Sequence, residues 1–462
     1  MPETVKRKFF GTDGVRGVAN VHPITPEVAL KLGRAAARVL VHGKKQTNEN
    51  GSAIWPKCII GKDTRISGDM LEAAFAAGMT SEGVDVQLAG VVPTPCVSFM
   101  VREEQASLGV VISASHNKFD DNGIKFFNSG GYKLSDDEEM ALEELILADD
   151  SLLNETARPQ AGKIGRISVL PKANERYAHM AADSIGHGKP DILKGMKIAL
   201  DTANGASCDT SPKVLEMLGA EVISEFTEPN GVNINEKCGC TVAKEIIRMT
   251  RESGAQVGLS HDGDADRILL CDENGDTLDG DEIMAVIAYD LLKKGQLKDN
   301  TLVATIMSNG GLDAMVEANG GKVLRAGVGD RYVMQLMQAG GYNFGGEQSG
   351  HIVCRDYNTT GDGIVAGLQV LRIMAETRKP LSELRKCMTK FPQTLVALPV
   401  ASKPPVEELT EAQALIAETK GRVLLRYSGT EPKIRLLIEG EDINYLNERS
   451  DLISAAIIRQ IG

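Results

Sequence analysis

The sequence lacks several features that would place it in a broad class of proteins. It has no run near the roughly 18 apolar residues that a membrane-spanning helix needs, and its first residues, MPETVKRKFFGTDG, contain no apolar core of a signal peptide. It also lacks an excess of positive charge: the formal net charge of -12 argues against a general binder of nucleic acid or membrane surfaces. These absences predict a cytoplasmic protein without nucleic-acid or membrane partners, in which any anion site is a local basic pocket.

Cysteine patterns typical of a disulfide framework or a zinc site are missing too. The eight cysteines are scattered along the chain and lie mostly in apolar, strand-like contexts, which favours reduced packing residues. Cys238 and Cys240 form the one close pair, and no second Cys/His pair stands near them, so a zinc site is not expected. A Walker A pattern and a G-x-S-x-G elbow are also absent, which excludes a P-loop and the usual serine hydrolase.

What the sequence does contain is a repeated local pattern. With 462 residues, of which 42% are hydrophobic, the chain is long enough for three or four domains. Residues 57–90, 196–226 and 300–329 each contain an apolar strand, a small polar loop, a helix, a glycine and a second strand. Strands that alternate with helices predict parallel or mixed sheets covered by helices, with ligand loops at the carboxyl ends of the strands.

The C-terminal part departs from this pattern. Residues 422–440, RVLLRYSGTEPKIRLLIEG, predict two strands joined by a polar turn, followed by a closing helix. We therefore predict an α/β protein with three similar mixed-sheet α/β domains and a smaller α+β C-terminal domain around a central cleft. The predicted domains are residues 1–165, 166–278, 279–388 and 389–462.

The first candidate site is the stretch GVVISASHNKFDDNGIKFF at residues 109–127, where a buried strand ends in Ser113, Ser115, His116 and Asn117. Taken alone, these residues also fit a polar turn in which serine and asparagine satisfy backbone groups. Adjacent serine and histidine do not form a hydrolase triad, because neighbouring strand residues point to opposite faces. The stretch needs a second site to interpret it.

That second site is the loop DGDADR, which alternates Asp262, Asp264 and Asp266 between two apolar strands. Three carboxylates on one side of an extended loop repel one another unless a hard cation lies between them, and this oxygen-only set favours magnesium. An EF-hand fails because Arg267 occupies the position of its required glycine and the following RILLCD is strand-like. A solvated acidic turn is the remaining alternative.

Two further loops carry groups that bind sugars and phosphates. NFGGEQSGHIV brings Glu347, Ser349 and His351 onto a glycine-flanked turn suited to sugar hydroxyls, although an ordinary polar turn fits as well. RYSGTEPKIR offers arginine, hydroxyl and backbone N–H groups, a set that cradles phosphate; a hairpin turn with surface arginines is the alternative. Phosphate oxygens commonly complete the coordination shell of Mg²⁺, so a phosphorylated Ser115 would link the serine loop to the loop of the three aspartates.

Five motifs together resemble the α-D-phosphohexomutase superfamily: FFGTDGVRG, VVISASHN with DNGIKFF, DGDADR, GGEQSGH and RYSGTEPKIR, which stand in that order between residues 9 and 435. The resemblance implies that Ser115 carries the phosphoryl group and that activation requires its phosphorylation. It also implies one Mg²⁺ per chain, bound by Asp262, Asp264, Asp266 and the phosphorylated serine.

The same resemblance assigns the other residues of the cleft. Sugar hydroxyls would be held by Glu347 and Ser349, and the substrate's own phosphate by a C-terminal set of Arg426, Ser428, Gly429, Thr430 and Arg435. Supporting positions would be Arg16, His116, Lys125, Arg267, Asp330, Arg331 and His351. Lys125 would be the partner for proton transfer. The family commonly has proline where this chain has Lys118, which puts the rigidity of the serine loop in doubt.

Within the superfamily, the resemblance is greatest to enzymes of amino sugar metabolism. It implies an isomerase that interconverts glucosamine 6-phosphate and glucosamine 1-phosphate through a bisphosphorylated sugar, and so supplies UDP-N-acetylglucosamine for cell-wall precursors. A small sugar phosphate is the expected partner, and a homodimer fits the family. The alternatives are a glucose or mannose phosphate mutase of the same superfamily and a non-catalytic sugar-phosphate sensor.

Overall fold

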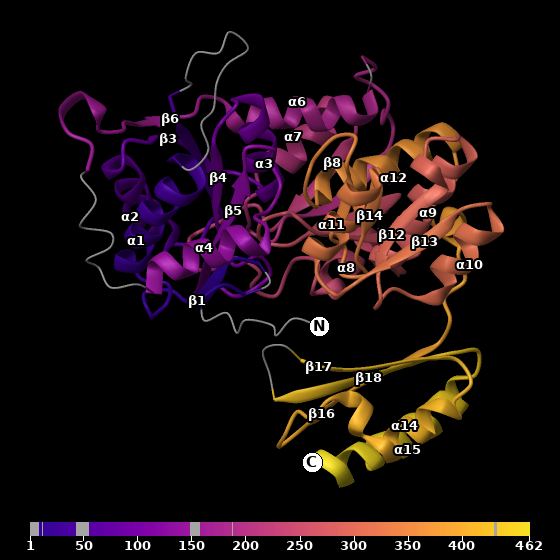
Figure 1. Cartoon of the computed structure of the whole chain (residues 1–462). Coiled ribbons are helices and arrows are strands. Elements are labelled where there is room, and N and C mark those ends of the chain that lie inside the picture. Colours follow the sequence, from indigo (N-terminus) through magenta and orange to yellow (C-terminus); the bar gives the residue numbers. More distant parts are fainter. Residues whose placement is uncertain (1–8, 12, 43–54, 148–157, 187, 429–431) are drawn as a thin grey trace.

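The structure is a computed structural model that describes residues 9–11, 13–42, 55–147, 158–186, 188–428 and 432–462. Within these ranges the chain forms four β-sheets, each at the centre of one domain, which we name domains I to IV in chain order (Figure 1). Short 3₁₀ turns occur at Ala161–Lys163, Lys298–Asn300, Arg385–Cys387 and Val406–Glu408. None of the described helices is long and apolar enough to cross a membrane.

Domain I is built on a sheet with strand order β1-β5-β4-β2-β3-β6. The strands are β1 (Val15–Val18), β2 (Lys57–Lys62), β3 (Asp85–Val91), β4 (Leu108–Ile112), β5 (Asp121–Asn128) and β6 (Ile167–Val169). The helices are α1 (Pro26–Ala36, continued by a π-helical segment Ala37–His42), α2 (Gly68–Ser81), α3 (Thr94–Glu103) and α4 (Asp136–Leu147). Because β6 pairs with β3, the first sheet extends past the boundary that we predict at residues 165/166.

Domain II is built on a sheet with strand order β11-β10-β9-β7-β8, and domain III on one with the order β13-β12-β14-β15. Domain II contains α6 (Ala173–Gly186), β7 (Lys197–Asp201), α7 (Thr210–Met217), β8 (Glu221–Glu225), α8 (Ala243–Ser253), β9 (Val257–His261), β10 (Ile268–Asp272) and β11 (Thr277–Leu278). Domain III contains α9 (Gly280–Lys293), β12 (Thr301–Thr305), α10 (Gly310–Ala318), β13 (Lys322–Ala326), α11 (Asp330–Gly340), β14 (Phe344–Gly346), β15 (Ile352–Cys354), α12 (Gly363–Thr377) and α13 (Leu381–Leu384).

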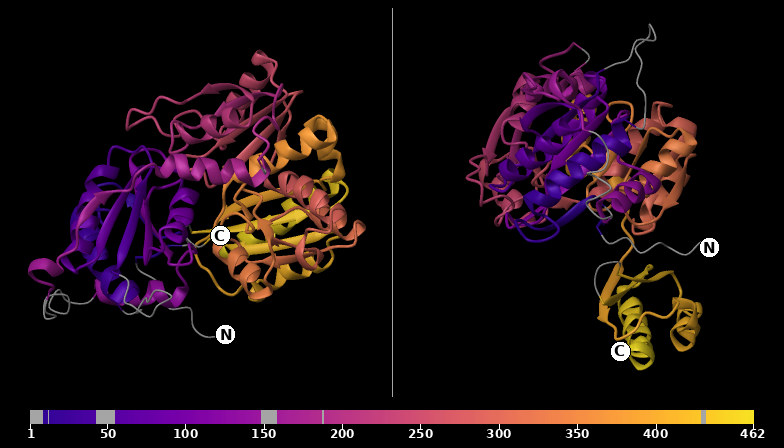
Figure 2. Two further views of the ribbon diagram at one scale, coloured as in Figure 1. Left: turned by 90° about the horizontal axis from the view of Figure 1, so that it is seen from above. Right: turned by 60° about the vertical axis from the view of Figure 1, so that its left-hand side comes forward.

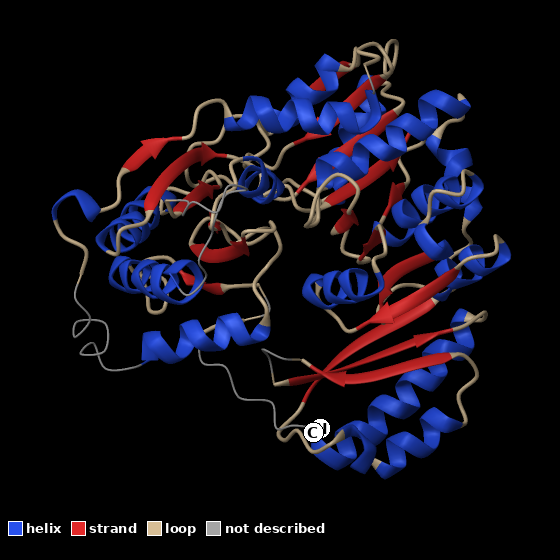
Figure 3. Ribbon diagram, turned by 45° about the horizontal axis from the view of Figure 1, so that its top comes forward, coloured by secondary structure: helices blue, strands red, loops and turns tan. Residues whose placement is uncertain are grey.

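The three sheets share a core arrangement. The strand orders β3-β2-β4-β5, β8-β7-β9-β10 and β13-β12-β14-β15 each consist of two parallel pairs followed by one antiparallel pair. Helices cover these sheets (Figure 3). The prediction of three similar mixed-sheet domains is therefore confirmed, and each predicted strand–helix–strand unit forms, as β2-α2-β3, β7-α7-β8 and β12-α10-β13.

Domain IV has an antiparallel sheet with the order β16-β18-β17. Its elements are β16 (Gln393–Pro399), α14 (Thr410–Ala417), β17 (Arg422–Tyr427), β18 (Lys433–Glu439) and α15 (Ile443–Ile461). The two strands and the closing helix predicted in this part of the chain are present, and α14 and α15 pack beside the sheet (Figure 3). Two views show domain IV as a separate lobe (Figures 1 and 2).

The distribution of buried apolar side chains explains this separation. One continuous hydrophobic cluster contains residues of domains I, II and III, for example Val97, Leu200 and Leu312, whereas Ile434 and Ile453 belong to a cluster confined to domain IV. Moving one of the first three domains would expose part of a shared core to water, which costs free energy in proportion to the area exposed. Domain IV can move without that cost.

Candidate active site

The loop that follows β4 places Ser115 at the junction of domains I and II. Ser115 is fully buried and has a φ angle of 53°, in the left-handed region that non-glycine residues seldom adopt. Its backbone N–H donates to Ser113 Oγ at 2.9 Å, and its Oγ donates to Asp262 Oδ2 at 2.5 Å. A strained serine held by such contacts is a hallmark of a functional loop.

Arg65, which the sequence interpretation missed, holds this loop in place. Its side chain is buried and donates from Nη2 to the carbonyls of Ser115, at 3.0 Å, and Asn117, at 2.8 Å. Nη1 donates to the carbonyl of Lys118 and to that of Asp121. These bonds fix the segment in which Lys118 stands where the family commonly has proline, so the loop does not depend on a proline ring for its shape.

Asp262, Asp264 and Asp266 lie on the loop between β9 and β10. All three are buried, and one oxygen from each lies within 4.8 Å of the other two. Burial, together with repulsion from Asp266 and Asp264, raises the pKa of Asp262 to about 8. A loop that faced solvent would not bury its carboxylates, so the alternative of a solvated acidic turn is wrong.

The carboxylates also have oxygens to offer a cation. Oδ1 of Asp264 and Oδ1 of Asp266 are buried without a hydrogen-bond partner among the described residues. Buried carboxylate oxygens are normally hydrogen-bonded or bound to a metal, and an oxygen-only set fits Mg²⁺. A Cβ on Gly263 would come within 2.7 Å of Ser115 O, so a glycine here lets the acidic loop approach the serine loop.

Lys125, on β5, connects the acidic loop with domain I. Its Nζ lies 2.7 Å from Asp264 Oδ2, 3.1 Å from Asp13 Oδ2 and 3.5 Å from Asp266 Oδ2. Burial alone would lower the pKa of this lysine, but the three carboxylates outweigh it and raise the pKa. Lys125 is therefore a buried ammonium group next to the carboxylates around Ser115.

The remaining basic residues of the predicted cleft surround the same loops. Arg16 forms an ion pair with Asp13, and Arg267 Nε lies 3.9 Å from Asp266 Oδ1. Burial, with Arg267 and Arg16 nearby, lowers the pKa of His116 to about 4, so this imidazole is neutral. His351 contributes Nδ1 at 3.6 Å from Asp266 Oδ2 and Nε2 at 3.3 Å from Asp330 Oδ2.

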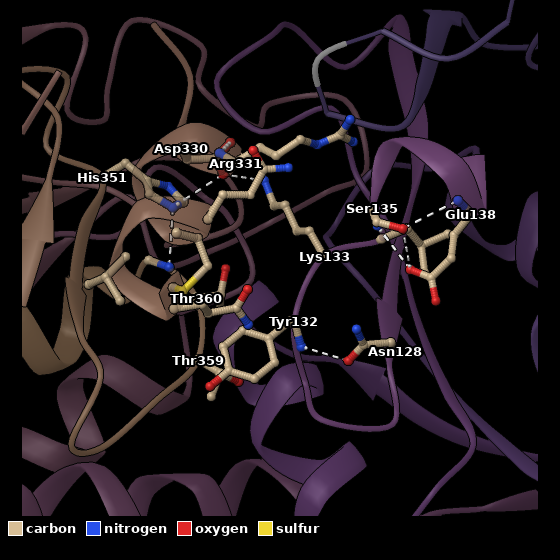
Figure 4. A pocket seen from close by; sticks show the side chains of 16 residues that line it. Asn128, Tyr132, Lys133, Ser135, Glu138, Asp330, Arg331, His351, Thr359 and Thr360 are labelled. Carbon is tan, nitrogen blue, oxygen red and sulfur yellow. Dashed lines mark hydrogen bonds and ion pairs between the residues drawn. The ribbon is translucent and has the colours of Figure 1, made fainter. Parts of the chain in front are cut away.

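Arg331 is placed differently from the other predicted residues. Its guanidinium pairs with two acids of α4, Asp136 at 2.6 Å and Glu139, and so ties α11 of domain III to domain I. A cavity of about 120 Å³ lies beside it between these domains, lined among others by Tyr132, Lys133 and Asp330 (Figure 4). These contacts show that Arg331 connects domain III to domain I. That Arg331 also binds the substrate stays a prediction.

The predicted sugar loop is the turn between β14 and β15. Glu347 Oε1 accepts a hydrogen bond from the backbone N–H of Gly329 at 3.1 Å, and the side chain of Ser349 is exposed. The turn is fixed against domain II, because the N–H of Ile268 donates to Gly350 O at 3.1 Å. Burial, with repulsion from Asp330, raises the pKa of Glu347.

The predicted phosphate anchor lies on domain IV. Arg426 on β17 and Arg435 on β18 are directly opposite each other in the sheet, and Ser428 is buried at the end of β17. Gly429 and Thr430 lie outside the described residues. Burial and the charge of Arg435 lower the pKa of Arg426. Like charges opposite each other destabilise a sheet unless an anion binds between them.

The structure thus brings Lys125, the three aspartates, Arg16, Arg267 and His351 together beside Ser115. It places Arg331 against α4, and it places Arg426, Ser428 and Arg435 on the separate lobe. Four residues of the site were missed: Asp13, Arg65, Lys133 and Asn235, whose Nδ2 donates to Ser115 O at 2.9 Å. Asp13 lies inside the motif FFGTDGVRG and carried a usable signal. The other three had none.

Comparisons with known proteins agree with this architecture. Four models of the phosphoglucomutase/phosphomannomutase family match in order: the alpha/beta/alpha domain I at residues 7–152, domain II at 175–275, domain III at 279–391 and the C-terminal domain at 395–452. A structure of a phosphoglucomutase/phosphomannomutase family protein from Burkholderia thailandensis has a TM-score of 0.79 and 21% identity, with 97% of each chain covered, which supports the fold.

The chain therefore belongs to the phosphoglucomutase/phosphomannomutase family, as its motifs imply. Similar curated proteins indicate which members of this family the chain resembles. A phosphoglucosamine mutase of Syntrophotalea carbinolica is 46% identical over 465 residues, with 99% of each chain covered, and one of Anaeromyxobacter dehalogenans is 47% identical over 467 residues, covering 99% of this chain and all of that protein. The expected resemblance to amino sugar mutases, which are isomerases, is confirmed.

Proposed function

We propose that the chain interconverts glucosamine 6-phosphate and glucosamine 1-phosphate, with Ser115 as the phosphoryl carrier. The observation that carries this proposal is the 2.5 Å contact between Ser115 Oγ and Asp262 Oδ2, inside a buried group of three aspartates. A site that only bound a sugar phosphate would need neither a strained serine nor a set of metal ligands around it. The similarity to phosphoglucosamine mutases supports the choice of substrate.

In the proposed reaction, phosphorylated Ser115 donates its phosphoryl group to the free hydroxyl of the sugar phosphate. The resulting bisphosphate turns around in the cleft, and its other phosphoryl group returns to Ser115 Oγ. Lys125 supplies a positive charge and passes the proton of the attacking sugar hydroxyl to the departing Ser115 Oγ, because its Nζ lies among the carboxylates beside Ser115. Arg16 and Arg267 add positive charge at the same place, where catalysis is chiefly positioning and electrostatics.

Asp262, Asp264, Asp266 and the phosphorylated Ser115 would hold one Mg²⁺. The two buried Oδ1 atoms without partners among the described residues support this assignment. When bound, Mg²⁺ neutralises charge on phosphate oxygens as the phosphoryl group is transferred. Arg267 and the hydrogen bond from Ser115 offset only part of the repulsion that raises the pKa of Asp262. A bound cation would offset the rest.

The sugar would be held by Glu347 and Ser349, and its phosphate by Arg426, Ser428, Gly429, Thr430 and Arg435. Since the sugar binds in two orientations, its 3- and 4-hydroxyls, near the middle of the ring, are suited to contacts that both orientations share. The 2-position then distinguishes substrates, and an acidic turn favours a cationic 2-amino group over a hydroxyl. The separate core of domain IV supports closure of the phosphate anchor over the cleft.

One assay tests the proposed function against its two alternatives. Turnover of glucosamine, glucose and mannose phosphates is measured in the same coupled system, and we expect kcat/KM to favour glucosamine phosphate by at least about tenfold. Equal turnover of glucose or mannose phosphate would instead indicate a broader mutase of the family. A sensor would turn over none of them and would show no added phosphate on Ser115 by intact mass.

We further propose a cytoplasmic enzyme that takes small sugar phosphates as its partners and supplies amino sugar precursors. A homodimer, and the absence of nucleic-acid and membrane partners, stay predictions. So do the domain boundaries at residues 278/279 and 388/389. Sedimentation of the purified chain would test the dimer.

A further inference from the structure

Six buried or half-buried side chains, in which carboxylates alternate with lysine or histidine, form a closed ring at the centre of the molecule. In order, they are Lys125, Asp13, Lys133, Asp330, His351 and Asp266. Lys125 lies 3.1 Å from Asp13, and His351 lies 3.6 Å from Asp266. Asp266 closes the ring on Lys125 at 3.5 Å.

The ring joins three domains through charged side chains. Asp13, Lys125 and Lys133 belong to domain I, Asp266 to domain II, and Asp330 and His351 to domain III. Figure 4 shows Lys133 reaching across from domain I to Asp330, with His351 on the far side of that carboxylate. A side chain in this ring cannot shift without changing the position of its neighbours.

Lys133 lies between two carboxylates of the ring, which would repel each other without it. Its Nζ pairs with both Asp13 and Asp330, and each of these carboxylates has its pKa lowered, against burial, in part by this lysine. Asp13 in turn accepts from Lys133 through Oδ1 and faces Lys125 Nζ through Oδ2. Lys133 therefore controls where Asp13 stands, and Asp13 helps to set where the ammonium group of Lys125 stands.

The backbone around Lys133 is built to hold it there. Asn128, at the end of β5, accepts from the N–H groups of Gly130 at 2.9 Å and Tyr132 at 3.3 Å, which closes a tight turn. Gly131 has a φ angle of 75°, and its carbonyl accepts from Ser98 Oγ in domain I and Thr359 Oγ1 in domain III. A Cβ at Gly131 would approach both of these residues within 2.7 Å, so the turn is wedged between two domains.

We infer that Asp13 and Lys133 are positioning residues of the phosphoryl transfer, which fix Lys125 and His351 relative to Ser115 without themselves contacting the sugar. The inference rests on the proposed function. Misplacing a catalytic group by a fraction of the ring's spacing costs about 10- to 100-fold in rate. Neither residue belongs to the predicted sugar or phosphate loops, so the affinity for substrate should be nearly unaffected.

The test compares Lys133→Met, Lys133→Arg and Asp13→Asn in the full-length enzyme with the wild type. Lys172→Met is the matched control, because Lys172 is exposed and lies in the loop before α6. We expect Lys133→Met to lower kcat on glucosamine 6-phosphate by about tenfold or more, with KM changed by less than about twofold. Lys133→Arg should recover a large part of kcat, since it restores a cation between the two carboxylates.

Stability and catalysis are separated by two measurements. Each kcat is taken well below the unfolding temperature of the variant and divided by the fraction of chains that accept phosphate on Ser115, measured by intact mass. A purely structural role would lower the unfolding temperature of Lys133→Met and leave this normalised kcat unchanged, which would overturn the inference. A rise in KM that accounts for the whole loss would also overturn it, because the residue would then act in binding.

The double variant Lys133→Met/Asp13→Asn keeps the test informative if the single variant folds poorly, because it removes both charges of one pair. If the two residues act through each other, its loss in kcat should be close to that of the worse single variant. Fully additive losses would contradict the ring. If the wild type and Lys172→Met turn over no hexose phosphate, the proposed function itself is wrong; if both do and Lys133→Met matches them, only the inference is.

Discussion

Ser115 Oγ of domain I lies 2.5 Å from Asp262 Oδ2 of domain II, although 147 residues separate them in the sequence. The serine donates the hydrogen bond, and its backbone carbonyl accepts from both Arg65 and Asn235. Contacts from domains I and II thus hold the backbone of Ser115, and its hydroxyl group lies beside the aspartates of the predicted metal site.

The first prediction concerns this carrier. Ser115→Ala should lower kcat by several orders of magnitude, because it removes the hydroxyl group that carries the phosphoryl group. The fold should be kept, because no other group is lost. Intact mass should show no phosphate on the variant after incubation with a hexose bisphosphate. Ser113→Ala is the control, because Ser113 Oγ accepts from the N–H of Ser115 and hydrogen-bonds with Asp63, and so has a structural part in the same loop. Phosphate mapped to Ser113, with activity retained in Ser115→Ala, would show that the assignment is wrong.

The second prediction concerns the metal. Asp264→Asn should weaken Mg²⁺ binding and lower turnover by about tenfold or more, because it removes one charge from the oxygen-only site. The same change at the exposed Asp276, in the turn after β10, should have little effect. Mg²⁺ is titrated into EDTA-treated enzyme while activity is measured, which gives both the apparent affinity for Mg²⁺ and the maximal turnover. Equal effects at the two positions would contradict a metal site on this loop.

Much of the fold could be predicted because its signals are local. Each strand–loop–helix–strand unit is formed by one contiguous stretch of the sequence. The alternation of Asp262, Asp264 and Asp266 likewise predicts that the three carboxylates point to one side. The pairing of β6 with the sheet of domain I could not be predicted, because β6 is only three residues long and exposed, so that no apolar pattern marks it.

The connections between the domains could not be predicted, because they depend on residues far apart in the chain. Lys133 and Asp330 are 197 residues apart, and neither sits in a pattern that names the other as its partner. Arg331 was expected in the cleft from the family resemblance, but its guanidinium pairs with α4. Arg65 looked like an ordinary polar residue after a strand, and only the fold shows that it is buried beneath the serine loop.

The third prediction concerns the phosphate anchor on domain IV. Arg435→Ala should raise KM by about 10- to 100-fold, because a charge-assisted contact contributes about 1.5–3 kcal/mol. Arg459→Ala, an exposed arginine of α15 that pairs with Glu411, is the control and should leave KM unchanged. An unchanged KM in Arg435→Ala would mean that phosphate binds elsewhere.

The fourth prediction concerns stability and pH at Asp281, a buried residue of α9. Burial, followed by repulsion from Asp279, raises the pKa of Asp281 from 3.8 to about 7, and its Oδ2 accepts from the N–H of Asn309 at 2.8 Å. Because the pKa is higher in the folded state, folding favours the protonated form. The resulting stabilisation is complete below the unfolded pKa and is lost as the pH rises through about 7.

Asp281→Asn, which is neutral at every pH and still offers an oxygen to Asn309, should therefore gain stability over the wild type as the pH rises. We expect the difference in free energy of unfolding, variant minus wild type, to be more positive at about pH 8 than at about pH 5 by roughly 1–3 kcal/mol. Thermal unfolding at both values measures it, with the exposed Asp276→Asn as control. A difference that does not change with pH would show that Asp281 is ionised in the folded protein throughout this range.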